Sequence, residues 1–162
     1  MLELYLPYLI ALALGMDVQA AEPGENSGTL PAETVRAPEP QVVDGSYTSA
    51  IEVKPILDMT QVQWVAIGTE SGNDLLYFST LLAWRCGLWE IRYGINGDAT
   101  TVLPMEPCHM DSLAPGAMVD LINFPIYLTF PKDSIQTLRI ELTFDDGTED
   151  FVDLARAQIL LP

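Results

Sequence analysis

The sequence predicts a mainly β fold, a small antiparallel β-sandwich that follows an N-terminal apolar leader. Three observations lead to this prediction. Short segments in which apolar and polar residues alternate are separated by Gly, Pro, Asn and Asp. Two pairs of these segments are joined by turn sequences typical of hairpins. The only two cysteines suit a single disulfide in a small domain. One short helix is possible at residues 75–84, because a short apolar run does not distinguish the periodicity of a helix from that of a strand.

Residues 1–21 have the character of a signal peptide or a short N-terminal anchor. The uncharged apolar run at residues 4–16 would span about 20 Å as a helix, less than the roughly 30 Å hydrocarbon core of a bilayer. Small residues at 18–20, ahead of Ala21, suit a cleavage site. The run is preceded by Glu3 and by no Lys or Arg, so the uncleaved anchor stays as the alternative.

Residues 22–48 predict a linker. They are rich in Pro and Glu and hold few large apolar side chains, so burial would not offset the entropy cost of ordering them. Residues 49–162 then form the predicted β-sandwich domain, stapled by one disulfide. A domain of that length can bury a real core without a metal.

The first half of the domain carries the weaker patterns. Residues 50–56 alternate and suit an edge strand, because Pro55 is tolerated only at an edge. Residues 61–67 have the composition of a strand. Residues 75–84 could be one face of a helix or a buried strand, and a strand followed by a helical turn is favoured.

The second half carries the stronger patterns. Residues 88–95 alternate and lead into Asn96-Gly97, a dipeptide that favours the type I′ turn of a hairpin, and residues 100–103 then return. Residues 134–144 also alternate, with the apolar side chains expected to point inward. The Asp145-Asp146-Gly147 turn follows, and residues 148–154 form the returning strand.

This closing hairpin resembles the last two strands of immunoglobulin- or fibronectin-like domains. Trp84 or Trp89 beside Cys86 resembles the tryptophan that packs on the core disulfide of such domains. The resemblance is architectural, covers about a third of the domain and implies no function.

Cys86 and Cys108 predict a disulfide, since an even cysteine count in an exported chain favours pairing. A loop of that length stabilises the folded state by about 3 kcal/mol in the chain-entropy model. Leader and cysteines together predict a periplasmic or secreted protein.

Composition excludes several functions. A net charge of −16, with seven scattered Lys and Arg, argues against nucleic acid and against docking on an anionic membrane surface. A membrane would be contacted only through a retained N-terminal segment. No nucleophile motif or phosphate-binding loop is present, and His109 is the single histidine, so neither an enzyme nor a cofactor is expected.

Residues 105–118 gather soft ligands. Met105, His109 and Met110 could bind Cu(I), which thioether and imidazole groups favour, so a copper carrier is the alternative function. The simpler interpretation is that methionine fills gaps around Cys108.

The main functional hypothesis is a binding surface. Residues 113–130 place apolar side chains beside several prolines, which suits a displayed and rigid segment. An exposed apolar patch on a small acidic domain usually marks a partner. We therefore expect an accessory domain that binds an envelope protein, with a contact made by Leu121, Ile122, Phe124 and Tyr127.

Overall fold

The computed structural model describes residues 35–162. The predicted leader and the predicted linker up to residue 34 lie outside these described residues. The compact unit spans Arg36–Pro162, so it includes residues 36–48 of the segment expected to be linker. No helix within the described part of the chain is long and apolar enough to cross a membrane.

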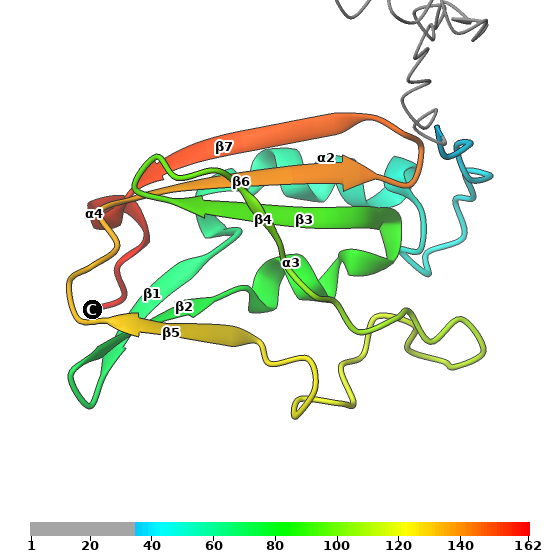
Figure 1. Ribbon diagram of the computed structural model, residues 1–162. Helices are drawn as coiled ribbons and strands as arrows, with labels where there is room; N and C mark the ends of the chain where they lie inside the picture. The colour runs from blue at the N-terminus through cyan, green and yellow to red at the C-terminus, as the bar shows by residue number, and fades with distance from the viewer. Residues whose placement is uncertain (1–34) are drawn as a thin grey trace, which may run out of the picture. The chain divides into compact units, whose positions relative to one another are not determined.

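Seven strands in the described residues form two antiparallel sheets (Figure 1). Sheet A has the order β1-β2-β5, and sheet B the order β4-β3-β6-β7. The prediction of a mainly β, antiparallel sandwich is confirmed. The strand bounds are, for sheet A, β1 Ala66–Glu70, β2 Asn73–Tyr77 and β5 Tyr127–Pro131; for sheet B, β3 Leu88–Ile95, β4 Thr101–Val102, β6 Thr137–Phe144 and β7 Glu149–Ala155.

Both predicted hairpins form in sheet B. Asn96 and Gly97 have φ of 53° and 84°, the left-handed conformation that a type I′ turn needs between β3 and β4. In the second hairpin, β6 pairs with β7 from Thr137 opposite Ala155 to Thr143 opposite Glu149. The predicted inward side chains of this region are all buried: Ile135, Leu138, Ile140, Leu142 and Phe144.

The edge strand expected at residues 50–56 is wrong, because Ala50–Met59 is helix α2. Its buried residues, Ala50, Val53 and Leu57, follow the spacing of one helical face. Pro55 is exposed on the other side of the helix. The segment 61–67 is only partly a strand: Gln61–Gln63 is a 3₁₀ turn, and β1 begins at Ala66.

The ambiguous segment 75–84 is a strand followed by a short helix, as favoured above. β2 ends at Tyr77, and α3 spans Ser79–Ala83. A 3₁₀ turn at Arg85–Gly87 leads into β3, and α4 spans Arg156–Ile159.

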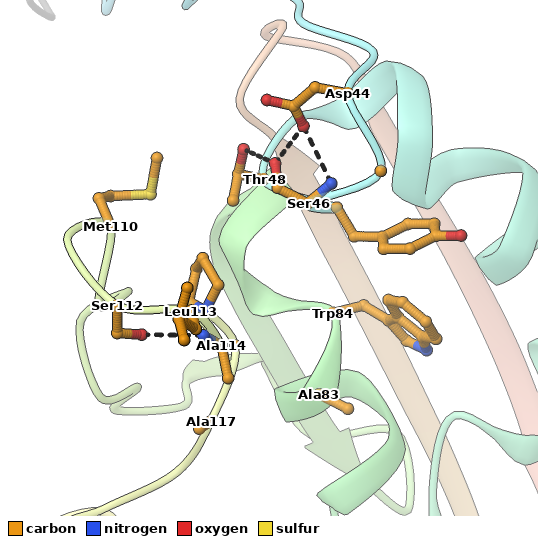
Figure 2. A pocket seen from close by; sticks show the side chains of 14 residues that line it. Asp44, Ser46, Thr48, Ala83, Trp84, Met110, Ser112, Leu113, Ala114 and Ala117 are labelled. Carbon is orange, nitrogen blue, oxygen red and sulfur yellow. Dashed lines mark hydrogen bonds between the residues drawn. The ribbon is translucent and has the colours of Figure 1, made fainter.

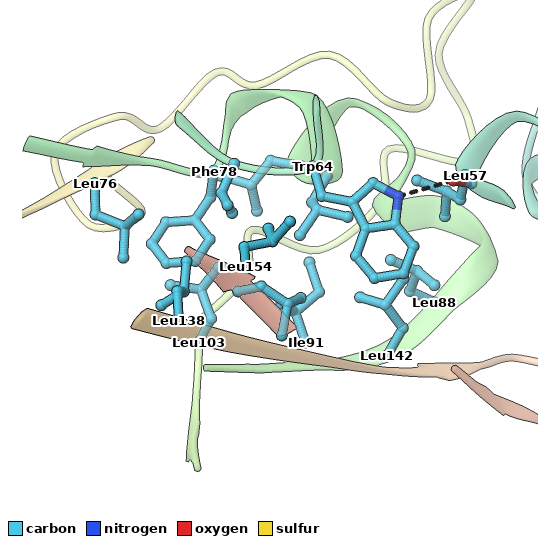
Figure 3. Packing of buried hydrophobic residues seen from close by; sticks show 14 of the residues in the cluster. Leu57, Trp64, Leu76, Phe78, Leu88, Ile91, Leu103, Leu138, Leu142 and Leu154 are labelled. Atoms are coloured by element: carbon cyan, nitrogen blue, oxygen red, sulfur yellow. Dashed lines mark hydrogen bonds between the residues drawn. The ribbon is translucent and has the colours of Figure 1, made fainter. Parts of the chain in front are cut away.

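The core lies between the two sheets and is closed by α2 and α3 (Figure 3). Trp64 is fully buried and donates its indole N–H to the carbonyl of Leu57 at 2.9 Å. The fully buried tryptophan is thus Trp64, whereas Trp84 and Trp89, beside the disulfide in the sequence, are only half-buried.

Candidate functional site

The long loop, residues 103–126, connects β4 to β5 and contains no helix or strand. From residue 107 to residue 134 no side chain is buried. A segment of this length that runs over the surface needs partners for its backbone groups, and two buried charged side chains supply them.

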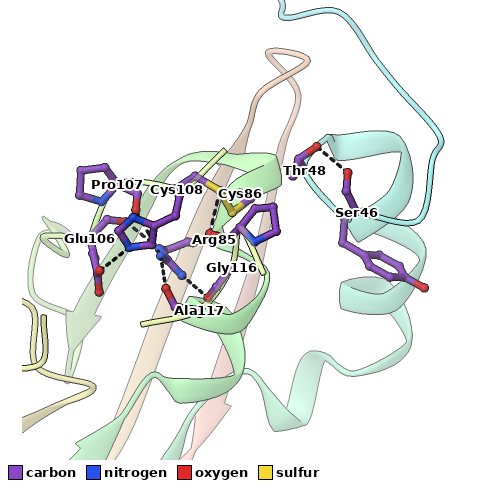
Figure 4. Close-up of a disulfide and its surroundings, with 12 residues drawn as sticks. Ser46, Thr48, Arg85, Cys86, Glu106, Pro107, Cys108, Gly116 and Ala117 are labelled. Carbon is purple, nitrogen blue, oxygen red and sulfur yellow. Dashed lines mark hydrogen bonds and ion pairs between the residues drawn. A yellow bond between two sulfur atoms is a disulfide. The ribbon is translucent and has the colours of Figure 1, made fainter. Parts of the chain in front are cut away.

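Arg85 is the first of these anchors. It is 3% exposed and lies beside Glu106, Gly116 and Ala117 (Figure 4), and its guanidinium donates hydrogen bonds to five backbone carbonyls. One belongs to Leu82, and the other four belong to the long loop: Glu106 at 2.6 Å, Pro107 at 3.3 Å, Gly116 at 2.6 Å and Ala117 at 3.1 Å. Burial lowers the pKa of Arg85, and the nearby charge of Glu106 partly offsets this effect. Arg85 thereby fixes two separate stretches of the loop against each other.

Glu106 is the second anchor, also 3% exposed. Its carboxylate accepts the backbone N–H groups of Val119 and Asp120 at 3.0–3.2 Å, and it lies 2.6 Å from His109 Nε2. Burial alone would raise the pKa of Glu106. The hydrogen bonds from His109, Asp120 and Val119 outweigh that effect, and the pKa lies below its ordinary value.

The disulfide closes the same region. Cys86 and Cys108 are bonded, with Cα atoms 5.5 Å apart (Figure 4), which confirms the predicted pairing. Cys86 follows Arg85, and Cys108 lies two residues after Glu106. The covalent bond and both anchors therefore hold the start of the loop. A disulfide is compatible with an extracytoplasmic protein.

The predicted contact residues divide into two groups. Leu121 and Ile122 lie in a turn closed by Phe124 N–H donating to the carbonyl of Asp120 at 3.0 Å, and Ile122 is 93% exposed. Phe124 is half-buried. Tyr127 starts β5 and is exposed beside Tyr77, with 5.4 Å between ring centroids. Three more exposed apolar residues of the loop, Met110, Leu113 and Val119, were not among the predicted contact residues.

The candidate copper ligands are placed unevenly. Met105 packs against the core, whereas Met110 is exposed. Both line a cavity of about 460 Å³ beside the disulfide, but His109 does not and instead contacts Glu106. Among the described residues no group of three or more His, Cys, Asp or Glu is placed to hold a metal.

The strap, residues 36–49, forms the other irregular region. Glu52 of α2 accepts the backbone N–H groups of Asp44, Gly45 and Tyr47 at 2.6–3.0 Å. Tyr47 has φ of 55°, which is unusual for a bulky residue. Its ring packs edge-on against Trp84, with centroids 5.3 Å apart. These contacts hold the strained residue in place.

A cavity of about 630 Å³ lies between the strap and the long loop (Figure 2). Asp44 and Tyr47 line it from the strap, Met110 and Leu113 from the loop, and Trp84 from the domain between them. The aromatic and apolar lining could bind an apolar group, and no charged side chain other than Asp44 lines it.

Asp145 fixes the strap and the start of α2. It is 3% exposed, and its Oδ1 atom accepts both the Ala50 backbone N–H and the Gln41 side-chain amide at 2.8 Å. Its own carbonyl accepts the Glu39 backbone N–H at 2.8 Å. Burial raises the pKa of Asp145, since these two hydrogen bonds only partly offset the cost of holding its charge.

Comparison with protein-family models, with characterised proteins and with solved structures finds no match to the chain. The site is therefore defined by its own geometry. That geometry rests on Arg85 and Glu106, which the sequence did not single out. Their positions beside Cys86 and Cys108 were the available signal.

Proposed function

We propose that the chain is an exported accessory domain, periplasmic or secreted, that binds a protein partner of the cell envelope without catalysis. The contact surface comprises the second half of the long loop and the start of β5. Leu121, Ile122, Phe124 and Tyr127 form its centre.

One observation carries this proposal. The long loop presents apolar side chains to solvent while Arg85, Glu106 and the disulfide hold its backbone between Glu106 and Asp120. A loop that is already ordered loses little conformational entropy when a partner covers it. Burying an isoleucine or leucine in an interface contributes about 1.5–3 kcal/mol. A rigid apolar display thus has the properties of a binding surface.

The polar groups of the region favour binding over acid–base catalysis. His109 is the only histidine of the chain, and Glu106 already contacts its ring. Glu106 in turn accepts backbone N–H groups of the loop. Both groups are engaged in holding the loop, a structural role that supports binding as the proposed function.

Site-specific photo-crosslinking in cells tests the proposal. A benzoylphenylalanine residue replaces Ile122 in one variant and Met59 in the control, which is 87% exposed but lies on α2. Position 122 should give one discrete crosslinked protein, and position 59 should not. The additional change Phe124→Ala with Tyr127→Ala should remove the crosslink and leave the circular dichroism spectrum intact. Equal crosslinking from both positions would contradict the proposal.

The alternative is a Cu(I) carrier, favoured by the shared cavity of Met105 and Met110. A competition titration with a chromogenic Cu(I) chelator should then transfer copper to the protein, and Met105→Leu should prevent it. No transfer to the unmodified protein would remove this alternative.

A further inference from the structure

Sheet A ends in an unprotected edge strand. Natural sheets protect their edges with charged side chains, short strands or a covering segment, because unpaired backbone groups otherwise recruit another strand. The two sheets have four edge strands: β1 and β5 in sheet A, and β4 and β7 in sheet B.

Three of these edges carry such a device. β4 has two residues only. β7 carries the acidic side chains Glu149, Asp150 and Asp153. β1 is covered by the C-terminal segment, where Ile67 forms a parallel bridge with Leu160 and accepts the N–H of Leu161 at 2.8 Å.

β5 has none of these features along most of its length. It belongs to an uncharged run, residues 121–131, in which no side chain is buried. The other uncharged run of equal length, residues 59–69, holds Trp64, Val65 and Ile67 in the core. Only the end of β5 is protected, by Pro131 and the following Lys132.

The register shows which backbone groups of β5 are free. Phe78 N–H donates to the carbonyl of Ile126 at 2.8 Å, next to the pair Tyr77–Tyr127. Since hydrogen-bonded and non-bonded pairs alternate in an antiparallel ladder, the N–H and C=O groups of Tyr127 and Thr129 point away from β2. Among the described residues no backbone hydrogen bond from outside the sheets reaches these four groups.

We propose that the partner adds an extended strand to the edge of β5, pairing with the backbone of Tyr127 and Thr129. This inference rests on the proposed function, because it specifies the chemistry of the partner at the same surface. Backbone pairing would provide affinity, and the exposed side chains of Leu121 and Ile122 would provide specificity.

The net charge of the domain indicates what kind of partner strand would bind. Residues 36–162 hold all seven Lys and Arg and 18 of the 23 Asp and Glu, a net formal charge of 7 minus 18, or −11. A second copy would bring the same charge to the edge and be repelled. A strand that is apolar at alternate positions and flanked by Lys or Arg complements both the uncharged edge and the net negative charge of residues 36–162.

A synthetic peptide tests the inference on the full-length protein. The probe alternates threonine and valine, with two lysines at each end, and the control peptide carries glutamates at the ends. The lysine peptide should slow hydrogen exchange at the Tyr127 and Thr129 amides by about tenfold or more, measured by NMR. The glutamate peptide should not slow it.

Variants at one position separate backbone pairing from side-chain contact. Thr129→Pro removes the outward N–H group without affecting the bonds to β2, so the lysine peptide should no longer protect Tyr127. Thr129→Ala should preserve the protection.

Three outcomes would overturn the inference. They are a lysine peptide that protects neither amide, protection that persists in Thr129→Pro, and a concentration-dependent dimer in which β5 is already protected. If the Ile122 crosslink still forms after any of these results, the binding surface survives and only strand addition fails.

Discussion

The strap and the long loop are both irregular, yet only the long loop has both of its charged anchors buried. Buried Asp145 binds Glu39 and Gln41 of the strap, and Glu52, a half-buried carboxylate on α2, accepts backbone N–H groups of its second half. Buried Arg85 and Glu106 bind the backbone of the long loop from the protein interior, and apolar side chains of the loop stay exposed to solvent. An anchor in the interior therefore leaves a loop surface free for a partner, whereas an outer anchor is itself part of the surface.

The largest expected effect tests the interior anchor. Arg85→Ala removes a buried guanidinium and leaves up to five carbonyls without their charged donor. We expect the free energy of unfolding to fall by about 4 kcal/mol. In the control Arg92→Ala, a half-buried arginine is removed that donates to a single backbone carbonyl, that of Thr100, and the loss should stay below about 1 kcal/mol. Chemical denaturation measures both.

Hydrogen exchange should locate the damage of Arg85→Ala in the long loop, with the strap retaining its protection. Equal loosening of the strap and the loop would show that the two regions are not independently anchored.

The disulfide gives the second effect. Cys86→Ser should lower the free energy of unfolding by about 3 kcal/mol and the melting temperature by several degrees. Because Arg85 still holds the loop, the exposed surface should keep its crosslinking through position 122. Two free thiols in the exported protein, detected by mass spectrometry, would contradict both the pairing and the compartment.

The smallest expected change in stability comes from two neighbouring aspartates, Asp145 and Asp146, whose pKa values are shifted in opposite directions. The pKa of Asp145 is raised above 3.8 by burial. Asp146 is partly buried as well, but Lys54, at 2.7 Å, and Thr148 hold its pKa below 3.8. Asp145 thus contributes stability at low pH that is lost as the pH rises through its raised pKa. Asp146 contributes stability above its ordinary pKa that is lost as the pH falls.

Replacing each aspartate by asparagine should therefore change the free energy of unfolding in opposite directions. Asp145→Asn keeps the Oδ1 acceptor and should raise stability at neutral pH by up to about 1 kcal/mol, with the gain vanishing toward pH 4 and below. Asp146→Asn should lower it by up to about 1 kcal/mol at neutral pH, with the loss also vanishing in acid. Stability curves between acid and neutral pH measure both, and a destabilised Asp145→Asn would mean that its charge is needed at the start of α2.

Local chemistry made the hairpins of sheet B predictable. The type I′ turn depends only on the backbone conformation of Asn96 and Gly97. The strand β6 is recognised from the alternation of apolar and polar residues along its own sequence. The disulfide followed from counting cysteines. These features lie within a few residues of each other or have a single possible partner.

Helix α2 and the loop anchors could not be predicted in the same way. The first N–H of α2 is bonded by Asp145, 95 residues further along the chain, and Leu57 lies outside the seven-residue window interpreted as a strand. Arg85 binds carbonyls as far away as Ala117. Backbone carbonyls have no sequence signature, so a side chain that binds them cannot be recognised by its partners.

The remote bond from Asp145 to α2 has a kinetic consequence. A ten-residue helix that contains Pro55 is marginal alone, so α2 gains its stability only after the β6–β7 turn has formed beside it. The first regular element of the described chain should thus be among the last to fold. Val53→Ala, at a buried position of the helix, should accelerate unfolding and leave the folding rate unchanged, a φ-value near zero. A φ-value near one would mean instead that α2 forms first and that the hairpin docks on it.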